Sequence, residues 1–210
     1  MILNKKIVLI GGRGHAQSII NLLIRKKLKK QIIGYTDNKK TDLNLEYIGN
    51  DQNLLKKFKP SKKIILVNCI GSNIKIRSKV FKFFKNKKYN FMSIIDNSSI
   101  ISNSSIIHEG VVIFPHVVIG PNTIIERNTH ILSLSNIDHG TRIGKNCYFG
   151  PSSVICGDVS IGDNVFIGAN SCIVENKLIA DNCTLGASGL LIKDCKIKNS
   201  TLMGVPAKRK

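Results

Sequence analysis

Histidine is the side chain best suited to move a proton near neutral pH, and this sequence has five of them. His139 stands out because it follows Asp138 and lies two residues past Ile137 in a repetitive region. We expect it to point outward, where it could act as a general base with Asp138 able to tune it. The other histidines of that region are His108, His116 and His130, and nothing near them supports a role. An inert surface imidazole at position 139 is the open alternative.

A second group of candidate residues is the glycine-rich run from Gly11 to His15. It follows a short apolar strand, Ile7–Ile10, and precedes a helical stretch, so its backbone amides could hold a phosphate. Asp37 ends the next predicted strand, where an acidic residue could meet a ribose or a base. The third glycine of a dinucleotide fingerprint is Gln17 here. Nucleotide binding is favoured, while an NAD site and a turn without ligand stay open.

The element that must position His139 is a repeat of six residues. An apolar residue recurs at every sixth place from Ile95 to Ile197, which gives 18 hexads without an insertion. A small or β-branched residue follows four positions after each, except at Lys177. This period predicts a parallel β-solenoid over residues 95–201 with three hexads per coil. Gly157 then lies one coil above His139 and leaves space over its ring.

The first 94 residues show a different pattern. Apolar strands are predicted at Ile7–Ile10, 31–36 and 63–68, and they alternate with helices near 16–28, 51–58 and 75–85. Such an order predicts a small parallel sheet of Rossmann-like type, with ligands beyond the carboxyl ends of its strands. The predicted domains are therefore residues 1–94 and 95–201, with a tail at 202–210.

Charge is distributed unequally between these regions. Residues 1–94 hold 22 Lys/Arg against four Asp/Glu, and residues 95–210 hold ten against nine. The lysines are spread over predicted helix faces and turns without interleaved aromatics, so no nucleic-acid partner is expected. A positive field of this kind would also attract polyanionic small molecules such as sugar nucleotides.

Targeting and redox signals point to the cytoplasm. The first apolar run is too short for a signal peptide, and no stretch is long enough for a membrane span. The six cysteines form no CxxC pair and are expected to be packed thiols. No His/Asp/Glu cluster has metal-ligand spacing, so no metal is expected.

Several motifs together resemble one family, the sugar O-/N-acyltransferases with hexapeptide repeats. The family includes sialic acid O-acetyltransferases and UDP-4-amino-sugar N-acetyltransferases, and the resemblance runs along almost the whole chain. The motifs that carry it are Gly11-Gly12-Arg13-Gly14-His15-Ala16, Gly34-Tyr35-Thr36-Asp37-Asn38, Ile70-Gly71-Ser72-Asn73 with Arg77, the hexads, Ile137-Asp138-His139-Gly140-Thr141-Arg142-Ile143-Gly144 and Gly204-Val205-Pro206-Ala207-Lys208.

This resemblance implies a left-handed β-helix, a homotrimer, acetyl-CoA as co-substrate and His139 as general base. It places the nucleotide of a sugar substrate in the N-terminal domain and acetyl-CoA between neighbouring subunits. The residues implied for the nucleotide are Arg13, Gly14, His15, Asp37, Gly71 and Arg77. Those expected along acetyl-CoA are Gly157, Gly168, Ala169, Gly186, Ala187 and Lys193.

The sequence departs from the family at three positions near the base. Gly140 replaces the acidic residue that often follows the histidine, Tyr148 replaces a second histidine, and Leu132 replaces an asparagine. The expected activity is acetyl-CoA-dependent N-acetylation of a UDP- or dTDP-linked 4-amino-4,6-dideoxy sugar in bacterial surface glycan biosynthesis. Two alternatives are O-acetylation of a free sugar such as sialic acid, and a non-catalytic solenoid scaffold with a basic docking domain.

Overall fold

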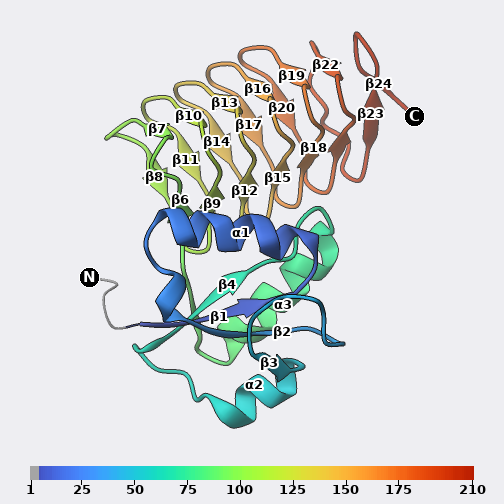
Figure 1. Ribbon diagram of the computed structural model, residues 1–210. Helices are drawn as coiled ribbons and strands as arrows, with labels where there is room; N and C mark the ends of the chain where they lie inside the picture. The colour runs from blue at the N-terminus through green and yellow to red at the C-terminus, as the bar shows by residue number, and fades with distance from the viewer. Residues whose placement is uncertain (1–4) are drawn as a thin grey trace. The chain divides into compact units, whose positions relative to one another are not determined.

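The computed structural model describes residues 5–210, and the chain divides between Ile94 and Ile95 into two compact units. Figure 1 labels most of the helices and strands of both units. The first unit is a five-stranded sheet of order β3-β2-β1-β4-β5 in which every pair is parallel. Its elements are β1 (Lys6–Ile10), α1 (Gly14–Arg25), η1 (Lys29–Gln31), β2 (Ile32–Thr36), β3 (Tyr47–Gly49), α2 (Asp51–Lys57), β4 (Ile64–Asn68), α3 (Ile74–Asn86) and β5 (Asn90–Phe91).

The central strand β1 shows why this sheet forms. Ile7, Val8 and Leu9 are all fully buried, without the alternation of a strand that has one wet face. Parallel strands covered on both faces have this continuous apolar character. Two details differ from the sequence-based expectation. Helix α1 ends at Arg25, about three residues early, and β3 is an additional short edge strand.

The second unit is a solenoid in which each coil adds one strand to each of three parallel sheets. Strands pair with a register of eighteen residues, as in Ile119 with Ile137 and Ile137 with Ile155, so three hexads make one coil as predicted. The first sheet contains β7 (Ile100–Ile101), β10 (Val118–Ile119), β13 (Asn136–Ile137), β16 (Val154–Ile155), β19 (Cys172–Ile173) and β22 (Leu190–Leu191).

The other two sheets complete each coil, and Figure 1 shows the coils stacked one after another. One contains β8 (Ile106–Ile107), β11 (Ile124–Ile125), β14 (Arg142–Ile143), β17 (Ser160–Ile161) and β20 (Leu178–Ile179). The last contains β6 (Ile94–Ile95), β9 (Val112–Ile113), β12 (His130–Ile131), β15 (Tyr148–Phe149), β18 (Phe166–Ile167), β21 (Thr184–Leu185), β23 (Thr201–Met203) and β24 (Lys208–Arg209).

The repeat is held together by its inner wall and by its turns. Wall residues such as Ile125, Ile131 and Ile137 are fully buried and stack into one core. Three positions after the wall residues from Ile107 to Leu185 the backbone enters the left-handed region, as at Asn122 (φ 57°) and Asn164 (φ 57°). Asparagine tolerates this conformation better than other side chains. That preference explains why asparagine recurs in the turns.

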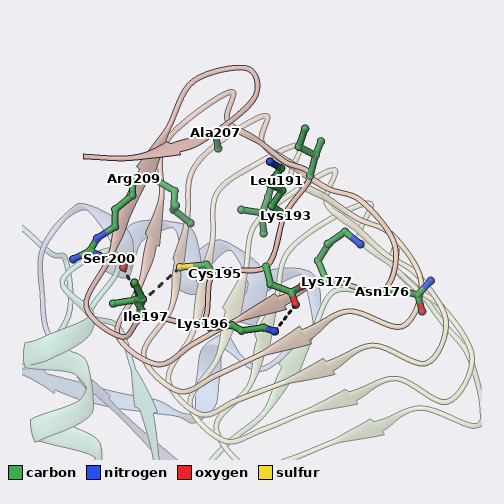
Figure 2. A pocket seen from close by; sticks show the side chains of 13 residues that line it. Asn176, Lys177, Leu191, Lys193, Cys195, Lys196, Ile197, Ser200, Ala207 and Arg209 are labelled. Atoms are coloured by element: carbon green, nitrogen blue, oxygen red, sulfur yellow. Dashed lines mark hydrogen bonds and ion pairs between the residues drawn. The ribbon is translucent and has the colours of Figure 1, made fainter.

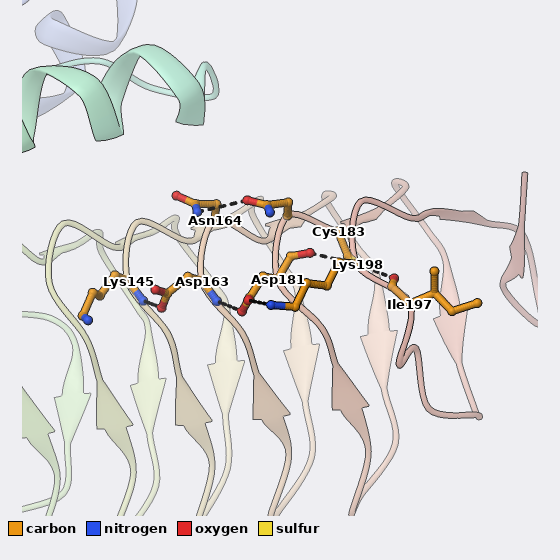
Figure 3. A network of polar contacts seen from close by, with 8 residues as sticks. Lys145, Asp163, Asn164, Asp181, Cys183, Ile197 and Lys198 are labelled. Atoms are coloured by element: carbon orange, nitrogen blue, oxygen red, sulfur yellow. Dashed lines mark hydrogen bonds and ion pairs between the residues drawn. The ribbon is translucent and has the colours of Figure 1, made fainter.

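Polar ladders join successive coils at the surface (Figure 3). Asn146 donates to Asn164 at 2.9 Å, and Asn164 donates to Asn182 at 3.1 Å. Beside them, the Asp181 carboxylate accepts from the backbone N–H of Asp163 at 2.9 Å and from Lys198 at 2.7 Å. The bond to Lys198 is the main cause of a lowered pKa at Asp181.

The last coil departs from the predicted hexads. The expected wall residue Ile197 is 56% exposed, and Cys195 takes its place beside Ile179. Leu202 then aligns with Leu185, seventeen residues earlier, so the regular repeat ends at Leu191. The predicted tail, residues 202–210, is part of the ordered fold, because β23 and β24 pair as an antiparallel hairpin at this end.

Candidate functional site

The carboxyl ends of β1, β2 and β4 bring together most of the residues predicted for a nucleotide. The backbone N–H of Gly12 donates to Asp37 at 2.9 Å, which ties the glycine turn to the end of β2. Gly12 has a packing reason of its own, since a Cβ there would lie 2.5 Å from the ring of Tyr35. At Gly14, apart from its two chain neighbours and the backbone of its own helix, no described atom lies within 4 Å of an added Cβ. The first turn of α1 is therefore open to the outside.

His15, Gly71 and Arg77 form a compact group beside this turn. The ring of His15 lies against Gly71, where an added Cβ would be 3.0 Å from its Cγ. Arg77 is fully buried and donates to the carbonyl oxygen of Gly71 at 2.9 Å. Burial, and then the positive charge of Arg77, lower the pKa of His15 to about 4. His15 is thus a neutral imidazole at pH 7.

The two arginines among the predicted nucleotide residues have different surroundings. The guanidinium of Arg77 is buried and braces the Gly71 loop, and the expected role of Arg77 in the nucleotide cleft stays a prediction. Arg13 is exposed and precedes α1 without a side-chain cap bond.

Sequence reasoning missed Asp51, whose side chain accepts a hydrogen bond from the Thr36 hydroxyl at 3.1 Å. Burial raises the pKa of Asp51; Thr36 opposes this rise, and the nearby Asp37 charge adds to it.

In the solenoid, His139 projects outward from the turn after β13, as the hexad register predicts. Its side chain is 57% exposed. The ring lies over Gly157, since a Cβ at that position would be 2.5 Å from its Cε1 atom. Glycine at 157 is therefore required by the position of the imidazole.

Two carboxylates lie close to His139: the predicted Asp138, and Asp158 from the next coil. Asp138 accepts from the backbone N–H of His139 at 2.7 Å, so its side chain turns back to the main chain. Asp158 of the next coil has its Oδ2 atom 3.7 Å from Nδ1 of His139. The signal for Asp158 was in the sequence, because it lies eighteen residues after Gly140, the neighbour of His139.

Of the small residues predicted for acetyl-CoA, Gly157 lies at the His139 corner. The other four, Gly168, Ala169, Gly186 and Ala187, lie at another corner of the coil, in the turns that follow β18 and β21. A Cβ on Gly168 would be 2.3 Å from the backbone nitrogen of Ala187, so close stacking of coils explains this glycine. Ala169 and Ala187 follow Gly168 and Gly186, so these four small residues form a glycine–alanine strip along this corner. The sheet that contains β13 and β16 separates this glycine–alanine corner from the His139 corner within one chain.

Lys193 lies in the His139 column and lines a cavity of about 720 Å³ at the last coil (Figure 2). The cavity arises where that coil is shortened, with the N–H of Cys195 bound to Leu178 at 2.7 Å. Four cationic side chains line it, together with Asp194, which pairs with Lys196 at 3.6 Å. The four are Lys177, Lys193, Lys196 and Arg209. The shortened coil also explains why a lysine stands at position 177 of the inner column.

Within residues 5–210, no three or more His, Cys, Asp or Glu side chains gather as metal ligands would. No helix in the described part of the chain has the length and apolar character needed to cross a bilayer.

Comparison with known proteins agrees with both halves of the chain. Residues 6–84 match the family model of the PglD N-terminal domain, and residues 122–157 and 140–175 match that of the bacterial transferase hexapeptide. No similar protein was found among curated protein sequences.

Solved structures extend the likeness to the whole chain. A histidine-to-asparagine variant of perosamine N-acetyltransferase from Caulobacter crescentus, in complex with CoA and GDP-perosamine, is 25% identical with a TM-score of 0.89. The match covers 98% of this chain and 96% of that one. The acetyltransferase domain of PglB from Neisseria gonorrhoeae has the same fold, with 20% identity, a TM-score of 0.91, and coverage of 99% of this chain and 100% of that one.

These findings define the class of protein first: an acyltransferase with an α/β N-terminal domain and a left-handed parallel β-helix, as the resemblance implied. Within that class, the N-terminal unit matches the PglD N-terminal domain and the solenoid matches the bacterial transferase hexapeptide, and the chain as a whole is similar to sugar N-acetyltransferases.

Proposed function

We propose that this protein transfers an acetyl group from acetyl-CoA to the amino group of a nucleotide-linked amino sugar, in bacterial surface glycan biosynthesis. A 4-amino-4,6-dideoxy sugar carried by UDP or dTDP is the proposed substrate. The observation that carries the proposal is the outward imidazole of His139, held over Gly157 on a solenoid of this family. A relative at 25% identity was solved with CoA and GDP-perosamine, which supports the substrate class.

The proposed reaction is a direct transfer. The sugar nitrogen attacks the thioester carbonyl, and His139 takes the proton that the amine loses. Backbone N–H groups stabilise the oxyanion of the tetrahedral intermediate. The C–S bond then breaks, and the proton passes to the departing sulfur, so that the amide and CoA thiol are the products. No covalent enzyme intermediate is required.

For the nucleotide, the carboxyl ends of β1, β2 and β4 supply suitable groups. The open N-terminal turn of α1 at Gly14 offers backbone amides to the diphosphate, and Arg13 adds a positive charge. Neutral His15 can donate or accept a hydrogen bond. Asp37 already accepts from Gly12, so its remaining capacity is available to a ribose or base.

For acetyl-CoA, two features of the solenoid support the proposed binding mode. The glycine–alanine strip, Gly168 with Ala169 and Gly186 with Ala187, lets the pantetheine arm lie close to backbone. Lys193 and its basic cavity stand in the His139 column, three coils away. That separation is about 14 Å at roughly 4.8 Å per coil, so the phosphates of CoA can lie there while its thioester is near His139.

The separation of the two corners supports a homotrimer. The sheet between them exposes a stripe of outward residues that includes Ile100 (68% exposed), Val118 (39%) and Val154 (38%), with Asn136 between the two valines. Packing of these faces around a three-fold axis would bring the glycine–alanine corner of one subunit to the His139 corner of the next. None of the six cysteines, which all lie in the described part, forms a disulfide, and this supports a reducing compartment, the cytoplasm.

The test is an incubation of purified protein with acetyl-CoA and a panel of acceptors, with thiol release and product mass as readouts. The panel holds UDP-, dTDP- and GDP-linked 4-amino sugars and free sialic acid. We expect N-acetylation of a nucleotide-linked amine, and the His139→Ala variant should lose 10²–10⁴-fold in kcat with CoA affinity intact.

Each other outcome of that panel has a defined meaning. Transfer to free sugar alone would replace the proposal with O-acetylation. If none of the acceptors in the panel leads to thiol release, the alternative of a non-catalytic scaffold is favoured. Near-normal turnover of His139→Ala would remove His139 as the base.

A further inference from the structure

Asp158 is a carboxylate that the predicted site did not contain, and the coil geometry places it beside the candidate base. Its Oδ2 atom is 3.7 Å from Nδ1 of His139. The two residues are also joined through the main chain, because the N–H of Asp158 donates to the carbonyl oxygen of His139 at 2.9 Å. The position of Asp158 relative to His139 is thus fixed by the stacking of one coil on the next.

Gly140 gives the Asp158 carboxylate its space. An added Cβ on Gly140 would lie 2.0 Å from Oδ1 of Asp158, far inside contact distance. Gly140 occupies the left-handed turn position (φ 64°) that elsewhere carries side chains such as Asn122, Asn146 and Asn164. A glycine at this one turn clears the room that the carboxylate fills.

Gly157 does the same for the imidazole, since its absent side chain is where the His139 ring lies. The other nearby carboxylate, that of Asp138, accepts a hydrogen bond from the backbone N–H of His139 at 2.7 Å and so is directed to the main chain rather than to the ring. Two glycines on successive coils therefore accommodate an imidazole and a carboxylate side by side.

We infer that Asp158 is the positioning residue for His139, an inference that rests on the proposed function. The Asp158 carboxylate accepts a hydrogen bond from Nδ1–H, which leaves Nε2 as the basic nitrogen that faces the amine, and it stabilises the imidazolium formed by proton transfer. At 3.7 Å the two atoms are beyond hydrogen-bond length. Both side chains are 57% exposed and can close this gap when substrate binds.

The first test replaces the carboxylate with its neutral amide. Asp158→Asn keeps the size of the side chain, and asparagine suits the left-handed turn at this position (φ 55°). We expect kcat to fall about 10- to 100-fold, with both KM values within about twofold of wild type. Asp163→Asn is the matched control, a turn carboxylate bound to the Lys145 backbone at 2.7 Å, and it should keep full turnover.

The second test moves the carboxylate. Asp158→Gly should lose activity as Asp158→Asn does, and adding Gly140→Asp should return kcat to within about fivefold of wild type. If Asp158 had only a structural role, a carboxylate at position 140 would not restore kcat. Wild-type kcat in Asp158→Asn or Asp158→Gly would overturn the inference, as would failure of the double variant to recover.

A measurement on the wild-type protein covers the case of an unstable variant. Long-range nitrogen–proton spectra of labelled His139, recorded with CoA and a nucleotide-linked amino sugar bound, should show a proton on Nδ1, and a proton on Nε2 would contradict the inference. The proposed function fails separately: if His139→Ala turns over normally, the base is wrong, whereas an inactive His139→Ala beside an active Asp158→Asn removes only the role of Asp158.

Discussion

The two histidines of the candidate sites show how environment separates one residue type into two functions. His139 is more than half exposed and beside a carboxylate, whereas His15 is buried next to Arg77. The sequence predicted the outward position of His139 because the hexad register places every residue on a known side of the wall. It did not predict Asp158 as the neighbour, because that contact depends on Gly140, whose missing side chain was interpreted only as a lost acidic residue.

At the same scale, His15 makes stability depend on pH. The pKa of His15 is about 4 in the folded protein and 6.5 for an unperturbed histidine, as in the unfolded chain. Between these two pH values only the unfolded chain binds the proton. The free energy of unfolding should therefore fall by about 2 kcal/mol because of His15 as the pH decreases from 7 to 5. Below pH 4, His15 should cause no further decrease.

Urea unfolding at pH 7 and pH 5 measures this effect. Tyrosine fluorescence reports the N-terminal unit, which holds Tyr35, Tyr47 and Tyr89 of the four tyrosines. The His15→Gln variant is the control and should lack this part of the pH dependence. An equal dependence in both proteins would contradict the assignment.

At the scale of elements, the hexad period predicted the solenoid, its three sheets and its eighteen-residue register. It failed in the last coil, where Cys195 replaces Ile197 beside Ile179. A periodic pattern of apolar residues continues there, but no further coil has to be covered, so the chain is free to shorten and close the end with β23 and β24. The short edge strand β3 was missed because three residues carry too little pattern.

Close contact between coils yields a prediction for a glycine outside both candidate sites. A Cβ on Gly144 would lie 2.5 Å from the carbonyl carbon of Gly162, a backbone atom that cannot move without its whole coil. Gly144→Ala should destabilise the solenoid by about 1–3 kcal/mol. Thermal unfolding followed by circular dichroism measures the loss, and Ser160→Ala, an exposed strand position, should change stability by less than about 0.5 kcal/mol.

At the scale of the whole molecule, activity should depend on assembly. The His139 corner and the glycine–alanine corner flank one sheet, and the proposed acetyl-CoA site needs one corner from each of two subunits. The exposed stripe of Ile100, Val118 and Val154 on that sheet is the surface through which they would meet. Sequence alone could not locate this surface, because the outward strand positions of all three sheets mix apolar and polar residues.

Val118→Asp should therefore yield monomers in sedimentation analysis and abolish acetyl transfer, because a charge would be buried in the proposed interface. Leu178→Asp is the matched control: Leu178 is exposed to the same degree, 38% against 39%, but lies on a different sheet. It should stay trimeric and active. A trimeric, active Val118→Asp protein would show that the subunits meet elsewhere.

The register of eighteen residues also limits how such a protein can change length. Gain or loss of a single residue within the regular coils would turn wall residues such as Ile137 and Ile155 away from the interior, whereas a whole coil could be added or removed with every wall contact preserved. The gap between His139 and the lysine cavity can thus change only in steps of about 4.8 Å. In this architecture, the reach of the acyl donor and the number of coils would have to evolve together.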